Sequence, residues 1–271
     1  MNDQFDRQSF LGPDSVDKLD ALRIGVCGLG GGGSHVVQQS AHVGVGHQFI
    51  SDPDIAKDVN LNRLIGATVD DVETERPKAE IGRRLVHGLL PNAEVIMIAK
   101  TWQEEAALMR TCHIIFGCLD GYGERAQLEA FCRRFLIPLI DIGMDVHRLE
   151  QGYDISGQVI LSMPGDHCMR CYGFITDAKL EEEARLYGAA GANPQVVWPN
   201  GVLASTAVGL AVNLICPWNT PVGSTYLEYD GNRHTVSTSN RLGAVVGRPC
   251  KHYHHGDVGD PFFALDLSAA A

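Results

Sequence analysis

Basic residues are scarce in this sequence relative to acidic ones. Its 271 residues include 22 Lys and Arg against 33 Asp and Glu, so the formal net charge is -11 and the isoelectric point is near 5.4. A nucleic-acid surface depends on a positive field that neutralises phosphates. The balance therefore argues against nucleic acid as the main partner, although it leaves room for a local basic pocket.

The sequence also lacks a long hydrophobic run and the basic-then-apolar start of a secretory signal. It begins MNDQFDRQSF, and its longest apolar stretch, residues 202–215, is shorter than the ~20 residues that span a bilayer. We therefore expect a cytoplasmic protein with no membrane partner. A hydrophobic content of 45% is enough to bury a full core.

Cysteine is too sparse and too scattered for a secreted disulfide framework. There are eight cysteines, and only Cys168 and Cys171 form a C-x-x-C pair. A thiol pair in a loop can grip Zn²⁺ from one side, and a redox pair is the competing interpretation. The other thiols are typical of small buried side chains.

Apolar periodicity predicts an α/β fold with a doubly wound, Rossmann-like sheet. A strand over 23–27, a glycine-rich turn, a helix over 34–43 and a strand over 48–51 form a βαβ unit. Further helices are expected over 78–90, 125–135 and 201–216, and further strands over 94–99, 113–118, 138–142, 226–229 and 235–237. The alternation over 153–162 favours a strand pair, so the sheet should be mostly parallel in its first half and mixed or antiparallel in its second.

These elements predict one domain over residues 22–255, preceded by an N-terminal arm over 1–21 and followed by a tail over 256–271. The arm is polar and has room for one short helix. The polar segment over 176–199 is long enough to be a binding loop.

The glycine-rich turn has the spacing of a phosphate-binding loop. Gly28, Gly30 and Gly33 satisfy G-x-G-x-x-G, with Gly31 between them, directly after a strand and before a helix. Asp52 ends the next strand, where a carboxylate can accept hydrogen bonds from ribose hydroxyls. A nicotinamide dinucleotide and ATP both fit this pattern.

Polar residues that follow Asp52 favour ATP. The stretch SDPDIAKDVNLNRLIG adds Asp54, Asn60, Asn62 and Arg63, for which a dehydrogenase has no need. Here the sequence resembles the ThiF family of adenylating enzymes, which includes the activators of ubiquitin and of sulfur-carrier proteins. The family pattern D-x-D followed by N-L-x-R is present as D-P-D and N-L-N-R.

Three more motifs extend the resemblance from about residue 5 to about residue 254. The F-D-R-Q stretch is similar to the family's arm, which implies that Arg7 reaches the ATP of the other subunit in a homodimer. Lys78, in R-P-K-A, matches the lysine that contacts the phosphates. Asp120, in C-L-D-G-Y-G-E-R, matches the aspartate that holds Mg²⁺, and Arg125 stands at the family's helix position.

The charges suit adenylation chemistry. Attack of a carboxylate on the α-phosphate brings two anions together and expels pyrophosphate, so cations must neutralise the triphosphate. Arg7, Arg63 and Lys78 would supply that field, and Asp120 would place Mg²⁺. We therefore predict these four residues as catalytic.

The resemblance also implies a structural zinc site. The family commonly closes such a site with a second C-x-x-C near the C-terminus, where this chain has C-K-H-Y-H-H and Tyr253 replaces the expected fourth cysteine. Cys168, Cys171 and Cys250 would then need a histidine. We expect His254 as that ligand, with His252 as the alternative.

The loop AAGANPQVVWPNG contains no cysteine, whereas relatives that form a thioester or persulfide keep one there. The resemblance therefore implies adenylation of the C-terminal carboxylate of a ubiquitin-like or sulfur-carrier protein, without a thioester. A precursor peptide and a small-molecule or tRNA-linked carboxylate are alternative substrates. An NAD-dependent oxidoreductase and a catalytically silent binding module are the alternatives from other classes.

Overall fold

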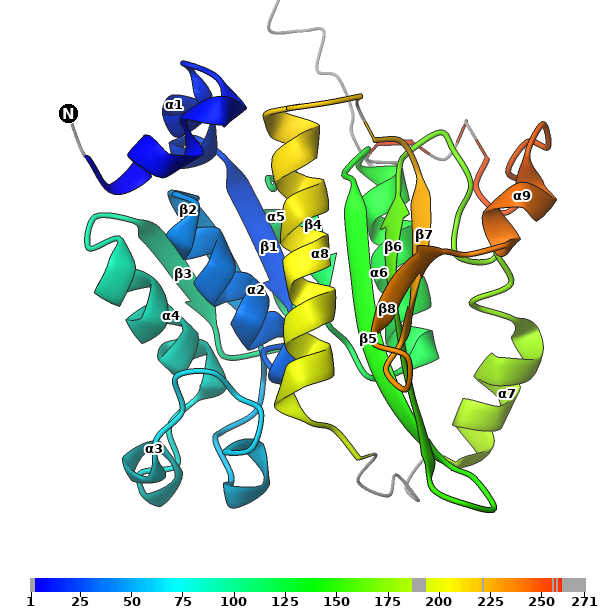
Figure 1. Ribbon diagram of the computed structural model, residues 1–271, viewed down its shortest axis with the longest axis horizontal. Coiled ribbons are helices and arrows are strands. Elements are labelled where there is room, and N and C mark those ends of the chain that lie inside the picture. Colours follow the sequence, from blue (N-terminus) through cyan, green and yellow to red (C-terminus); the bar gives the residue numbers. More distant parts are fainter. Residues whose placement is uncertain (1–2, 187–193, 221, 255, 257, 260–271) are drawn as a thin grey trace, which may run out of the picture.

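The computed structural model describes residues 3–186, 194–220, 222–254, 256, 258 and 259, and shows one eight-stranded sheet with helices on both faces (Figure 1). The strand order is β3-β2-β1-β4-β5-β6-β7-β8. The strands are β1 Arg23–Cys27, β2 His47–Ser51, β3 Glu94–Ile98, β4 Ile114–Gly117, β5 Leu139–Arg148, β6 Tyr153–Ser162, β7 Thr225–Asp230 and β8 Thr235–Thr238. The α-helices are α1 Ser15–Asp20, α2 Gly31–His42, α3 Val69–Glu73, α4 Lys78–Leu89, α5 Ala106–Met109, α6 Tyr122–Arg134, α7 Asp177–Leu186, α8 Val197–Ile215 and α9 Arg241–Val245.

The first five strands are parallel, with β1 between β2 and β4. β1 is buried along almost its whole length, as a strand covered by helices on both faces must be. Ile24, Val26 and Phe116 pack with α2 and α8 in one core, while Ile115 and Leu139 belong to a second core on the other face. The predicted doubly wound sheet is confirmed.

The second half of the sheet is antiparallel, from β5 through β8. The residues 153–162, predicted to form a strand pair, instead make the single strand β6, which pairs with β5 on one side and with β7 on the other. β5 is twice as long as expected, at 10 residues. Beyond Ile142 its added residues extend past the parallel strands and form a wall near their carboxyl ends.

Helices α7 and α8 differ from the predicted elements, and α2 and α6 each begin three residues before their predicted starts. The segment over 176–199, expected to be a loop, contains α7; its run of Ala, Lys, Leu and Glu is rich in good helix formers. α8 starts at Val197, before the expected 201, and is long and apolar enough to cross a membrane by length and composition. It packs against β5, β6 and α2, as expected of a core helix.

The N-terminal arm lies at the amino ends of the parallel strands (Figure 1). It contains a 3₁₀ helix, Asp3–Leu11, and then α1, so it holds one helix more than expected. The side-chain amide of Gln8 donates to the carbonyl of Val43 at 3.0 Å, and the ring of Phe5 lies against Gly44. The tail predicted over 256–271 lies outside the described residues except at 256, 258 and 259.

Candidate active site

A cavity opens at the carboxyl ends of β1, β2 and β4, the edge where doubly wound sheets bind ligands. It collects residues that the sequence places far apart. Its lining includes Gly28, Gly30, Asp52, Asp54, Asn60, Arg63, Lys78, Thr101, Trp102, Gln103, Asp120, Glu124 and Gln195. We call it the nucleotide cavity. It brings together the site residues predicted from the sequence except Gly31, Gly33, Arg7, Asn62, Arg125 and the predicted zinc ligands Cys168, Cys171, Cys250 and His254.

The glycine loop must be made of glycine for steric reasons. Gly28 has φ +88°, and a Cβ at this position would collide with the carbonyl oxygen of Cys118. A Cβ on Gly33 would collide with the carbonyl of Gly28. The loop therefore turns tightly into the N-terminus of α2, where free amides and the helix dipole favour phosphate.

Asp52 holds the loop to the end of β2. Its carboxylate accepts hydrogen bonds from the backbone amides of Leu29 at 2.6 Å and Asp54 at 2.8 Å. Burial raises the pKa of Asp52, opposed by the charge of Lys78 and by both amides. This carboxylate is thus fixed on the cavity wall, where it can receive hydroxyl donors.

Two cations face the same cavity. Lys78 is buried, with 8% of the residue exposed. Its Nζ lies 2.7 Å from the Asp54 carboxylate and 3.7 Å from that of Asp52. Arg63 donates from Nη1 to the Val59 carbonyl at 2.5 Å and to the Asn62 side chain at 3.0 Å. Within the described residues Arg63 makes no ion pair, so its charge remains available to an anion.

Asp120 follows β4 on the far side of the cavity. It is exposed, and its Oδ1 accepts a hydrogen bond of 3.3 Å from the side-chain amide of Gln195. Glu124 lies one helical turn further on, and burial, then the charge of Asp120, raises its pKa. Two close carboxylates on an open wall are a donor set that suits Mg²⁺.

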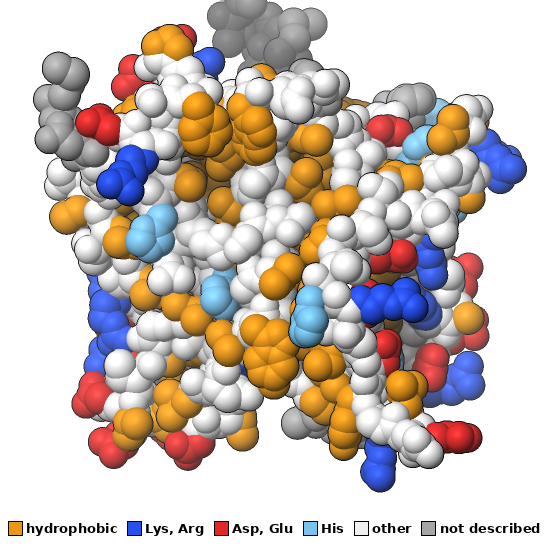
Figure 2. Space-filling model, in the orientation of Figure 1, with side chains coloured by type: hydrophobic (Ala, Val, Ile, Leu, Met, Phe, Trp, Pro, Cys, Tyr) orange, Lys and Arg blue, Asp and Glu red, His pale blue; other side chains and the backbone are white. Residues whose placement is uncertain are grey.

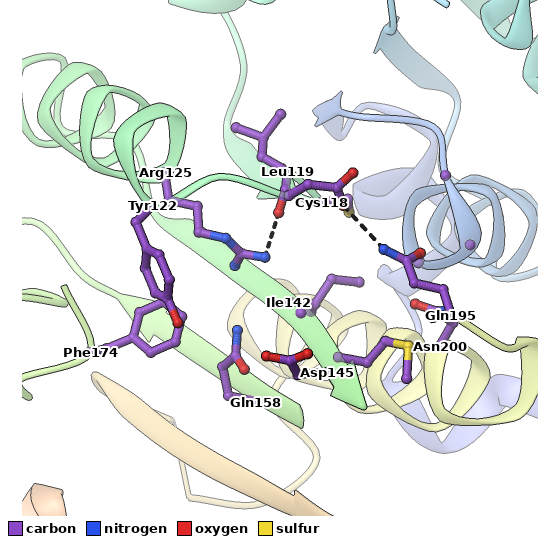
Figure 3. A pocket seen from close by; sticks show the side chains of 16 residues that line it. Cys118, Leu119, Tyr122, Arg125, Ile142, Asp145, Gln158, Phe174, Gln195 and Asn200 are labelled. Carbon is purple, nitrogen blue, oxygen red and sulfur yellow. Dashed lines mark hydrogen bonds between the residues drawn. The ribbon is translucent and has the colours of Figure 1, made fainter. Parts of the chain in front are cut away.

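A second cavity adjoins the first and shares part of its wall. Gly30, Cys118, Leu119, Asp120 and Gln195 line both cavities. The second cavity continues between β5, β6 and the start of α8, along Tyr122, Ile142, Gly143, Met144, Asp145, Gln158, Phe174 and Asn200 (Figure 3). We call it the β5–β6 cavity. None of the residues that β5 and β6 contribute to this cavity was predicted as a site residue from the sequence.

Arg125 lines this second cavity but is largely buried and already paired. Its guanidinium forms an ion pair with Asp141. It also donates to the carbonyl of Leu119 (Figure 3). Burial raises the pKa of Asp141 to about 6, against the opposing effect of Arg125. Through these two contacts Arg125 connects the turn at residues 119–121, which contains Asp120, to strand β5.

Arg7 does not join the cavities of its own chain. It is exposed on the arm, and the arm lies at the amino ends of the strands (Figure 1). Both cavities lie instead at the carboxyl ends. Any action of Arg7 on a nucleotide therefore requires another copy of the chain.

Cys168, Cys171 and Cys250 form a cluster with His252. The Sγ of Cys168 lies 3.6 Å from that of Cys171 and 3.7 Å from that of Cys250. The Nδ1 of His252 lies 3.3 Å and 3.4 Å from the first two sulfurs. A tetrahedral zinc with bonds of about 2.3 Å to sulfur and about 2.0 Å to nitrogen separates its ligand atoms by roughly 3.5–3.8 Å. The donors and their spacing fit that ion.

The histidine favoured by the sequence is not the one in this cluster. His254 instead accepts a hydrogen bond from the backbone amide of Gly256 at 3.0 Å. Tyr253, at the position of the expected fourth cysteine, lies toward the buried carboxylate of Glu129, with its hydroxyl 3.3 Å away. Glu129 also accepts from the amide of Met169 at 2.8 Å, so it links the two halves of the cluster.

None of the other thiols is placed as a nucleophile. Cys27, Cys112, Cys132 and Cys216 are buried, and burial raises the pKa of each. Cys118 lines both cavities, and burial raises its pKa as well.

A doubly wound sheet, a glycine loop at a helix N-terminus, and two cations facing carboxylates define a nucleotide-binding protein of the Rossmann-like class. The chain belongs to the ThiF family, whose model matches residues 2–243. The predicted membership is confirmed, and with it the expected class of adenylyltransferase.

Sequence relatives and solved structures match much of the chain. The sulfur carrier protein ThiS adenylyltransferase of Escherichia coli is 26% identical over 242 residues, covering 85% of this chain and 89% of that protein. The SAMP-activating enzyme E1 of Haloferax volcanii is 29% identical over 163 residues, covering 59% of this chain and 57% of its own length. The fold also matches E. coli MccB with ATP, at a TM-score of 0.72 and 19% identity, covering 89% of this chain and 72% of that chain.

Proposed function

We propose that this protein uses ATP to adenylate the C-terminal carboxylate of a ubiquitin-like or sulfur-carrier protein. The observation that carries the proposal is the common wall of the two cavities, which includes Gly30 and Asp120. A nucleotide in one cavity and an acyl tail in the other would meet at this wall. A dehydrogenase has no need of the cations that line the nucleotide cavity.

Each group of residues that lines the nucleotide cavity would have its own role in the reaction. Asp52 would accept the ribose hydroxyls, and the glycine loop with the N-terminus of α2 would receive phosphates. Arg63 and Lys78 would neutralise charge as a substrate carboxylate oxygen bonds to the α-phosphorus and the bond to the β-phosphate breaks. Pyrophosphate leaves with its electron pair, and no general base is needed because the nucleophile is already an anion.

One chain supplies too little positive charge to the nucleotide cavity to balance its carboxylates and a bound triphosphate. Arg63 and Lys78 face four carboxylates, those of Asp52, Asp54, Asp120 and Glu124. Adding a triphosphate would increase the negative excess, which is unfavourable in a partly buried site. We propose that Mg²⁺, held by Asp120, and Arg7 of a second copy supply the missing charge.

The α2–α8 face fits a second copy of the chain. α2 and α8 contain no Asp, Glu, Lys or Arg, yet part of both helices faces outward (Figure 2). Trp198 is 53% exposed near the carboxyl ends of the strands, and Trp218 is 47% exposed beyond the other end of α8. A two-fold axis across the middle of α8 would place each arm beside the partner's cavities, as a role for Arg7 requires.

We propose zinc as the occupant of the Cys168, Cys171, Cys250 and His252 cluster. These four donors would join the loop before α7 to the chain that follows α9. Zinc here would be structural, because four protein ligands leave no position for a substrate.

Relatives also support a second class of substrate. One MccB structure contains AMPCPP together with MccA, and two relatives are named tRNA threonylcarbamoyladenosine dehydratase. A precursor peptide is therefore the alternative acyl substrate, followed by a tRNA-linked carboxylate. In each case the acyl-adenylate would pass to an outside acceptor, and we place the reaction in the cytoplasm.

ATP–pyrophosphate exchange tests the proposal. Labelled pyrophosphate should enter ATP only when a carrier protein or peptide with a free C-terminal carboxylate is added. The same carrier with an amidated C-terminus is the matched control. Exchange that is equal with both forms, or absent with every carrier, peptide and tRNA tried, would contradict the proposed function.

A further inference from the structure

Glu183 of α7 is bound to the first turn of α6, next to Asp120. Its two carboxylate oxygens accept hydrogen bonds from the backbone amides of Tyr122 at 2.8 Å and Gly123 at 2.7 Å. These amides are donors without an intrahelical acceptor, and a carboxylate there also suits the helix dipole. Glu183 thus joins α7 to the turn that carries Asp120, although the two segments are about sixty residues apart in the sequence.

The two glycines of this turn leave space for the carboxylate. A Cβ on Gly121 would lie 2.8 Å from Oε1 of Glu183, and one on Gly123 would lie 3.2 Å from Oε2. Neither glycine has a positive φ, so backbone conformation does not require them. Their small size is explained by the close approach of Glu183.

Arg125 also holds this turn, through the carbonyl of Leu119, but the Asp120 side chain itself is weakly held. It is exposed, and among the described residues its carboxylate accepts one hydrogen bond, of 3.3 Å, from Gln195. Glu124 lies near the carboxylates of Asp120 and Glu183: burial, and then the charges of these two groups, raise the pKa of Glu124. Mutual repulsion of this kind is relieved by a divalent cation.

We infer that Glu183 is a positioning residue for the metal–nucleotide complex. By fixing the amides of Tyr122 and Gly123, it holds the two-glycine turn so that Asp120 meets the cation bound with ATP. It contacts neither ATP nor the cation. The inference rests on the proposed function, since it assigns the Asp120 turn to MgATP.

Calorimetry with Glu183→Gln tests this role, with MgATP and metal-free ATP titrated separately. Glu182→Gln is the matched control, because it makes the same charge change at an exposed position on the same helix. We expect Glu183→Gln to weaken MgATP binding about tenfold and metal-free ATP binding by less than about twofold, with Glu182→Gln like wild type. Gly121→Ala should reproduce the effect, and Gly88→Ala, which has open space around it, should not.

Three outcomes would overturn the inference. Glu183→Gln could bind MgATP like wild type while Asp120→Ala does not, which leaves the proposed function intact but removes Glu183 from it. Equal weakening with and without Mg²⁺, alongside a lower melting temperature, would make Glu183 only a helix cap. Wild-type protein that fails to bind MgATP would overturn the proposed function itself.

Discussion

The ammonium group of Lys78 lies 2.7 Å from the carboxylate of Asp54, on the wall of the nucleotide cavity. Lys78 is nearly buried, so this contact fixes a cation where the phosphates of ATP are expected. The Lys78 side chain is therefore already ordered before ATP binds, and the phosphates would compete with Asp54 for its ammonium group. Preorganisation of this kind lowers the entropy cost of binding.

Lys78→Met should therefore weaken ATP binding at least about tenfold while it keeps the length of the side chain. Calorimetry of MgATP binding measures the effect. Lys57→Met is the control, because Lys57 is exposed and lies outside the cavity lining. Equal effects of the two substitutions would contradict a specific role for Lys78.

The thiol cluster predicts which histidine matters for stability. Purified protein should contain about one zinc per chain, and His252→Ala should lose the metal and lower the melting temperature. His254→Ala should retain both, because its ring lies outside the cluster. Metal analysis together with thermal melts tests this, and metal loss only in His254→Ala would refute the assignment.

Arg7 should act in the other subunit. Arg7→Ala and Asp120→Ala proteins should each be inactive in pyrophosphate exchange, since each lacks one part of every site. Mixed and allowed to exchange subunits, they should regain activity, because a hybrid dimer contains one intact site. No recovery, once hybrid dimers are confirmed by native mass spectrometry, would argue against action in trans.

Asp71 should stabilise the fold in a pH-dependent way. Its buried carboxylate accepts from Arg84 at 2.7 Å and 2.6 Å and from Arg76 at 2.6 Å. Chiefly the hydrogen bonding to Arg84 lowers the pKa of Asp71 below its ordinary value of 3.8. A lowered pKa means that this contribution is full above pH 3.8 and is lost as the pH falls toward the folded-state pKa.

Asp71→Asn should consequently lower stability by about 2 kcal/mol at neutral pH. The deficit should narrow as the pH falls below 4, because the Asp71 carboxyl of the unfolded wild-type chain then binds a proton that the folded protein does not bind. Urea unfolding of both proteins from pH 7 to pH 3 measures it. A deficit that stays constant over this range would show that charge is not the cause.

The sequence could predict most of the sheet and the nucleotide cavity. Apolar periodicity marks strands, and the rule that ligands bind at strand carboxyl ends selects Asp52 and Asp120. The same rule could have selected Thr101, which follows β3 and lines the cavity. Family spacing then added Arg63 and Lys78.

The remaining contacts depend on tertiary structure that no local pattern encodes. Glu183 reaches α6 from a helix that lies in a predicted loop, and Arg125 of α6 pairs with Asp141 of strand β5. Choosing His252 over His254 depends on the direction of two side chains in one turn. The fold of the chain beside the C-x-x-C loop decides that the His252 ring points toward the thiols and that the His254 ring does not.

Calorimetric titration of wild-type and Arg63→Ala protein with MgATP and, separately, with NAD tests whether the glycine loop serves ATP. We expect saturable binding of MgATP by the wild type, weaker binding after Arg63→Ala, and no binding of NAD. Binding of NAD alone, unaffected by Arg63→Ala, would instead assign the glycine loop to a dinucleotide.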